Sequence, residues 1–159
     1  MKAMYKTLLP VLAGVALLIS AASGASAQSL SAKVTGAWTL VSGSEDYPDG
    51  KKNMPWATGN MILEPTGHIS LILVGKDQPK STSVRIPVGP FVAYYGTYTV
   101  NEADNTLMIK VEHSGAALQD GSVRTFKISF NGGNMTTTAS EVETPEGTMI
   151  PVNECKKAQ

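Results

Sequence analysis

Residues 91–100 read Phe-Val-Ala-Tyr-Tyr-Gly-Thr-Tyr-Thr-Val, and this stretch decides the fold because its residues pack well on a pleated sheet. Side chains alternate between the two faces of a strand, so Tyr94 and Tyr98 share one face and Tyr95 lies on the other. Rings on both faces predict a wall with an inside and a covered outside, since a strand at the rim of an open sheet is wet on one side. Gly96 marks a bend or bulge, which a sheet needs in order to curl into a small barrel.

Seven further segments alternate like strands, with turn residues between neighbours. They are residues 36–42, 60–64, 68–74, 106–113, 123–130, 135–140 and 148–155. No helical pattern longer than one turn occurs after residue 27. Eight antiparallel strands can close into a barrel whose interior is either filled or holds one small ligand. The sequence therefore predicts an all-β fold, an eight-stranded antiparallel up-and-down β-barrel with Trp38 at its closed end.

Two long segments have the composition of loops. Residues 45–55 are rich in Asp, Gly, Lys, Asn and Pro, and Trp56 stands just beyond them. Residues 75–90 are polar and contain three prolines, which exclude a helix of useful length. We expect the first segment to be a surface loop and the second to be a long loop across one end of the sheet.

Residues 1–27 have the pattern of a secretory signal peptide. Lys2 and Lys6 precede an apolar run at residues 8–19, and residues 25–27 offer an Ala-Ser-Ala cleavage site. The remaining residues 28–159 make one domain. No later stretch approaches the roughly 20 apolar residues that a membrane span needs, so we expect no stable membrane insertion after cleavage. The sequence therefore predicts that the protein is exported, to the periplasm or out of the cell.

The charge balance argues against nucleic acid as a partner. The chain carries 13 Lys and Arg and 13 Asp and Glu, and removal of the signal peptide takes away two lysines and leaves a net charge of minus two. The basic residues cluster only as the pairs Lys51-Lys52 and Lys156-Lys157, which are typical of a solvated surface.

The residue types that metals and nucleophilic catalysis require are scarce. Cys155 is the single cysteine, so no disulfide can form within the chain. Cys155 is either a half-buried residue of the last strand or a reactive or dimer-forming thiol. With His68 and His113 the chain has too few ligands for a metal site, and we expect no cofactor. Ser114 follows His113, but adjacent strand residues face opposite ways and make a poor catalytic dyad.

Four elements carry a resemblance to a known family. They are Gly36-x-Trp38, the segment 59–67 between two glycines, Ala-Tyr-Tyr-Gly-Thr-Tyr at 93–98, and Arg124-x-Phe126. Over residues 34–154 the chain resembles the bacterial lipocalin-like domain family. The resemblance implies an eight-stranded calyx with a central cavity, and it implies no single activity.

A polar group at the barrel mouth is the main candidate for ligand contact. His113 continues the apolar face of its strand and Arg124 begins the apolar face of the next, so both are expected near the same end. They would anchor a carboxylate, carbonyl or hydroxyl above an apolar cavity. In the alternative reading Arg124 closes one end by stacking on Trp38, as the corresponding basic residue does in lipocalins, and His113 is a simple strand-end residue.

The other predicted contacts are Tyr95, Tyr98 and Trp56, with Trp56 forming part of a lid. Tyr95 and Tyr98 can both face inward only if Gly96 marks a bulge that shifts the alternation by one residue. On a regular strand Tyr98 is the inward residue of the two. Gly36, Trp38 and Gly96 are assigned structural roles.

The predicted function is the binding of a small, largely apolar ligand by an exported protein. Two alternatives stay open: an isomerase-type or cyclase-type enzyme acting on a bound apolar substrate, and a packed structural barrel that binds nothing or only another protein. The volume of the interior distinguishes the packed barrel from the other two.

Overall fold

The computed structural model describes residues 28–78, 89–115, 119–145 and 147–159. The predicted signal peptide and the centre of the predicted loop at 75–90 lie outside these residues. The elements follow one another along the chain as α1 (Leu30–Val34), β1 (Gly36–Asp46), β2 (Lys52–Asn53), β3 (Trp56–Leu63), β4 (His68–Gly75), β5 (Phe91–Asn101), β6 (Thr106–Ser114), β7 (Val123–Asn131), β8 (Asn134–Ala139), β9 (Val142–Thr144) and β10 (Gly147–Lys157).

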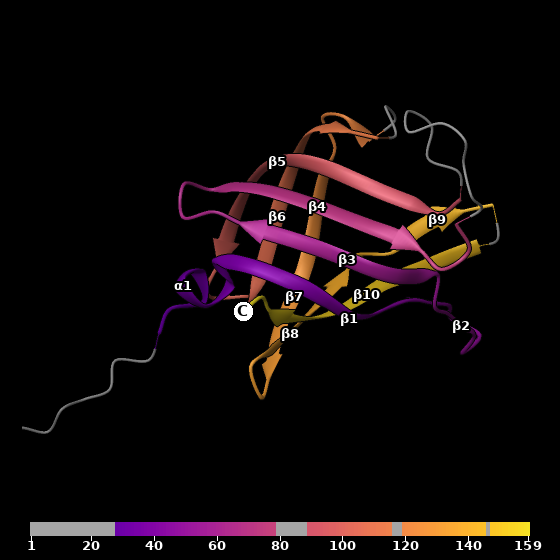
Figure 1. The fold of residues 1–159 in the computed structure, drawn as a ribbon, viewed down its shortest axis with the longest axis horizontal. Coiled ribbons are helices and arrows are strands. Elements are labelled where there is room, and N and C mark those ends of the chain that lie inside the picture. The colour runs from indigo at the N-terminus through magenta and orange to yellow at the C-terminus, as the bar shows by residue number, and fades with distance from the viewer. Residues whose placement is uncertain (1–27, 79–88, 116–118, 146) are drawn as a thin grey trace, which may run out of the picture.

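Eight of the strands form a closed antiparallel barrel (Figure 1). Neighbours follow the order β1-β3-β4-β5-β6-β7-β8-β10, and β10 pairs with β1 to close the ring. The short strands β2 and β9 extend the β1 and β10 ribbons at the end of the barrel away from α1. The predicted all-β class and the eight-stranded antiparallel barrel are therefore confirmed.

The prediction that residues 45–55 form a surface loop is wrong in part. β1 continues to Asp46, and a tight turn returns the chain to β2, with the Tyr47 amide donating to the Lys51 carbonyl at 2.9 Å. Gly50 has a φ of 86°, a value that glycine tolerates without strain. Trp56 is the first residue of β3, so this strand begins before the strand predicted at residues 60–64. The segment is polar because the two strands of this hairpin are exposed or half-buried.

Helix α1 covers one end of the barrel, and Trp38 packs beneath it. Leu30 and Val34 are buried, and the Val34 carbonyl accepts a hydrogen bond from Trp38 Nε1 at 2.6 Å. Lys157 Nζ lies 4.7 Å from the centroid of the Trp38 ring and donates to the carbonyl of Thr35. The Phe130 ring lies 6.1 Å from that of Trp38. This end of the barrel is filled by side chains, as predicted for Trp38.

The bulge expected near Gly96 lies on the opposite strand. β5 alternates regularly, whereas the pairing with β6 shifts between Tyr95↔His113 and Gly96↔Val111, which leaves Glu112 as the extra residue. A Cβ atom on Gly96 would lie 2.0 Å from the Lys110 carbonyl oxygen. The glycine therefore lets the β6 backbone come close enough to bulge, and the alternation changes on β6 after Val111.

Cys155 is 5% exposed on β10, inside the barrel. Burial, with a smaller contribution from the charge of Glu154, raises the pKa of the Cys155 thiol to about 11. Since the thiolate is the reactive form, we expect the native thiol to react far more slowly at pH 8 with an aromatic disulfide reagent than the thiol of the urea-unfolded chain.

The same pKa predicts a loss of stability at high pH. The unfolded thiol gives up its proton near its ordinary pKa of 9.0, whereas the folded thiol keeps its proton until about pH 11. The buried thiol therefore makes its full contribution to the free energy of unfolding below pH 9, and this contribution is lost as the pH rises from 9 to 11. Equal labelling rates for the native and unfolded chains would show that Cys155 is accessible and would contradict both expectations.

In the described residues, no helix is long and apolar enough to cross a membrane. Nor do these residues gather three or more His, Cys, Asp or Glu side chains in a group that could hold a metal ion.

Candidate ligand cavity

The interior of the barrel is hollow on the side away from α1. A cavity of about 230 Å³ lies there, and residues from all eight barrel strands line it. Most of its wall is apolar, with Met61, Leu71, Leu73, Ile109, Phe126 and Met149 among the lining residues. For comparison, an apolar cavity of about 150 Å³ is large enough to hold benzene.

Trp56 forms one wall because the strand beside it carries a glycine. A Cβ atom on Gly43 would lie 2.7 Å from Trp56 Cδ1 and 2.7 Å from Asn153 Oδ1. The indole and the amide therefore lie directly against the backbone of β1. Asn153 Oδ1 is buried and accepts no hydrogen bond from any described residue. Trp56 was predicted as part of a lid, and the structure places it in the cavity wall.

Arg124 brings a positive charge to the cavity from the start of β7, where it pairs with Ile109 of β6. Its guanidinium carbon lies 5.7 Å from the centroid of the Tyr94 ring, a cation–π arrangement. No carboxylate of the described residues lies within 4.0 Å of this guanidinium. The position over Trp38 belongs to Lys157, so the alternative in which Arg124 closes that end is wrong.

Tyr94 is the buried ring beside Arg124, and it was not among the predicted site residues. Burial raises the pKa of the Tyr94 phenol, and the charge of Arg124 and its hydrogen bond to the side chain oppose the rise. The phenol therefore stays protonated over the ordinary pH range and can donate a hydrogen bond. The period-two pattern places Tyr94 on the same face as Tyr98, so the sequence did indicate that Tyr94 faces the interior.

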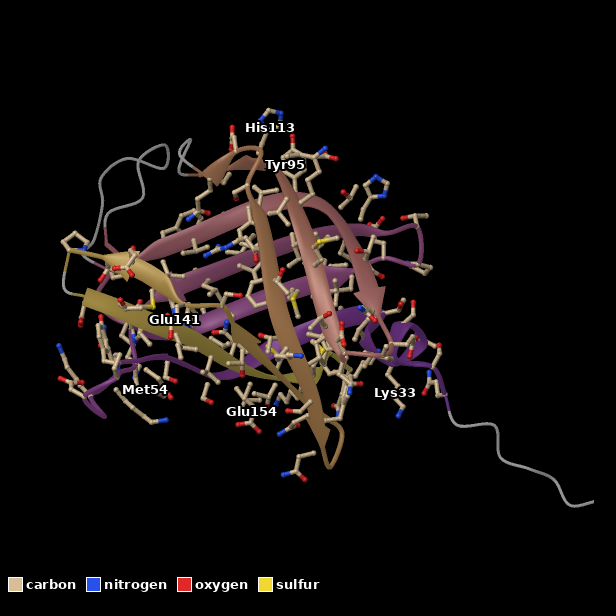
Figure 2. The ribbon with its side chains drawn as sticks, turned by 180° about the vertical axis from the view of Figure 1, so that it is seen from behind. Lys33, Met54, Tyr95, His113, Glu141 and Glu154 are labelled. Atoms are coloured by element: carbon tan, nitrogen blue, oxygen red, sulfur yellow. The ribbon has the colours of Figure 1, made fainter. Side chains whose placement is uncertain are left out.

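Two predicted site residues lie outside the barrel. Tyr95 is 50% exposed, and its ring centroid is 5.5 Å from that of His113 on the outer face (Figure 2). His113 Nδ1 lies 3.3 Å from Asp120 Oδ2. The prediction that His113 meets Arg124 inside the mouth is wrong, because the bulge at Glu112 turns His113 outward.

Tyr98 faces inward as predicted for a regular β5, but it lies in the filled half of the barrel. Its hydroxyl donates to the Glu64 carbonyl at 2.7 Å, and it lies 3.5 Å from the Thr35 hydroxyl near α1. Of the five predicted contact residues, the cavity is thus lined by Arg124 and Trp56.

No family model matches the chain, and no curated protein is similar to it at a significant level. Among solved structures, the chain is similar to an uncharacterized protein from Bacteroides eggerthii. The two share 20% sequence identity with a TM-score of 0.41, over 76% of this chain and 98% of that one. Membership of the lipocalin-like family therefore stays a prediction.

Proposed function

We propose that this protein binds one small, largely apolar molecule in the cavity between Trp56 and Arg124. The observation that carries the proposal is the uneven filling of the barrel interior. Side chains around Trp38 fill the half near α1, whereas the other half contains about 230 Å³ of space behind mostly apolar walls. A concave apolar wall with a few polar groups is the usual form of a small-molecule site.

The volume sets the size of the ligand. Scaled from the cavity of about 150 Å³ that holds benzene, 230 Å³ accommodates on the order of ten non-hydrogen atoms. This is below the range of roughly 300–1,000 Å³ typical of sites for drug-sized ligands. The proposal therefore concerns a molecule of the size of a substituted benzene. The packed barrel without a ligand is less consistent with this space.

The proposal includes export and a lipocalin-like relationship. Residues 1–27 have the charge, apolar core and small-residue end of a signal peptide, which supports a periplasmic or secreted location. A meander of eight strands that closes around a cavity is also the architecture that the family resemblance implies.

The methionines allow the function to be tested within one spectrum. Met61 and Met149 line the cavity, Met135 is buried elsewhere, and Met108 is 47% exposed. We expect toluene, titrated into protein labelled with ¹³C at the methionine methyl groups, to shift the signals of Met61 and Met149. An aromatic ring within a few ångströms changes the shielding of a methyl group strongly.

Met108 and Met135 are the internal controls, and their signals are expected to stay in place. Met61→Leu and Met149→Leu each assign one signal with little change of side-chain volume. Toluene that shifts none of the signals up to its solubility limit, or that shifts all of them alike, would contradict binding in the cavity.

A further inference from the structure

We infer that the ligand is a small monocarboxylic acid whose carboxylate lies against Arg124 and the hydroxyl of Tyr94. This inference rests on the proposed function, since it assigns the chemistry of the molecule held in the same cavity. Three features of the site carry it: the positive charge of Arg124 in the wall, the Tyr94 phenol beside that charge, and the position of the opposing carboxylate of Glu45.

Arg124 is the single cation among the described residues that line the cavity. It is half-buried, and its known neighbour is an uncharged ring, with no described carboxylate within 4.0 Å. A guanidinium taken partly out of water is stabilised by an anion, and its planar fork matches the two oxygens of a carboxylate. An apolar cavity with such a group in its wall favours an acid over a neutral molecule of the same shape.

Tyr94 adds a second donor at the same place. The Tyr94 ring centroid lies 5.7 Å from the Arg124 guanidinium carbon, and both side chains line the cavity. The phenol keeps its own proton because burial raises its pKa. That proton and the guanidinium hydrogens of the neighbouring Arg124 can be donated to one acceptor group. A carboxylate accepts several such bonds, which makes it the head group that fits best.

Glu45 determines which way an acid would lie. It lines the cavity from β1, and its Oε2 accepts a hydrogen bond from Asn53 Nδ2 at 2.9 Å. Two barrel strands, β8 and β10, separate β1 from β7 on that side. The wall thus carries a negative group and a positive group on different sides. An acid is expected to point its carboxylate at Arg124 and its apolar part at the rest of the wall.

The test compares benzoate with toluene, because both have a ring that fits and one of them has the carboxylate. Affinities are measured from the Met61 and Met149 methyl shifts in the parent protein and in Arg124→Met, which keeps much of the packing of the stem. We expect this variant to lose benzoate affinity by about tenfold to a hundredfold, the usual value of a charge-assisted hydrogen bond. Toluene uses none of the donors, so it serves as the reference probe, and the expected result is a loss of benzoate affinity relative to toluene affinity.

Two matched variants separate the local contact from the overall charge. Lys127→Met removes a positive charge from the exposed face of the same strand, where Lys127 donates to the Asp104 carbonyl. It is expected to leave both affinities unchanged. Glu45→Gln removes the opposing charge from the wall and is expected to strengthen benzoate binding relative to toluene binding.

The outcomes distinguish the inference from the proposed function. Toluene binding without benzoate binding, or benzoate binding that survives Arg124→Met, overturns the acid ligand and leaves the cavity proposal in place. Failure of both probes to bind overturns the proposed function itself. If Arg124→Met does not fold, Arg124→Lys takes its place; it keeps the charge without the fork, and unchanged benzoate affinity would then overturn the bidentate contact.

Discussion

Replacing Trp38 with alanine is expected to lower the free energy of unfolding by about 4 kcal/mol, near the middle of the range for removal of a buried tryptophan. The side chain is 1% exposed and is the largest among those that are fully buried. It also holds α1 through the Val34 carbonyl and supports the Lys157 ammonium. Its loss leaves a void beneath the helix and releases both contacts. Urea unfolding followed by circular dichroism measures the change.

Trp56→Ala is the matched control for this prediction. Trp56 has the same side chain but is half-buried, and it already borders the cavity. Because less of its surface is buried on folding, we expect a smaller loss, of about 1–2 kcal/mol. The same variant should weaken toluene binding, since it removes a cavity wall. Equal losses of stability for the two variants would show that the half around Trp38 is no better packed than the half around Trp56.

The eight barrel strands could be predicted because their signal is local. Period-two alternation and turn residues indicate which segments form strands, and consecutive strands of an antiparallel meander pair with one another. The position of Lys157 over Trp38 could not be predicted in this way. Lys157 reaches the ring because β10 pairs with β1, with Trp38↔Lys157 in register across the ring closure. Closure brings together residues from the two ends of the domain, and no local pattern specifies that register.

The site was predicted only in part, because alternation fails at a bulge. Arg124 and Trp56 line the cavity, whereas His113 continues the apolar face of β6 in sequence but not in space. Gly96 gave the correct signal for an irregularity. The sequence does not say which of two paired strands carries the extra residue, since this depends on the backbone that faces the glycine. Placing the bulge on β5 instead of β6 led to the selection of Tyr95 in place of Tyr94.

Gly96→Ala is the second variant with a large expected effect. The added Cβ atom would lie 2.0 Å from the Lys110 carbonyl oxygen and 3.0 Å from the Glu112 amide nitrogen. Both are backbone atoms of the bulge, so neither can move aside without breaking the pairing of β5 with β6. We expect a loss of about 3 kcal/mol or more of the free energy of unfolding, measured by urea unfolding.

Gly115→Ala provides the comparison, because its added Cβ atom would meet Phe91 Cε1 at 3.7 Å, an ordinary contact. Stability should change little in that variant. If Gly96→Ala folds, its β6 must be displaced at the bulge, and the ring contact of His113 with Tyr95 should change with it. The NMR signals of the His113 imidazole then report this displacement of β6. A Gly96→Ala protein with the stability of the parent and unchanged His113 signals would mean that β6 does not approach β5 as closely as the bulge requires.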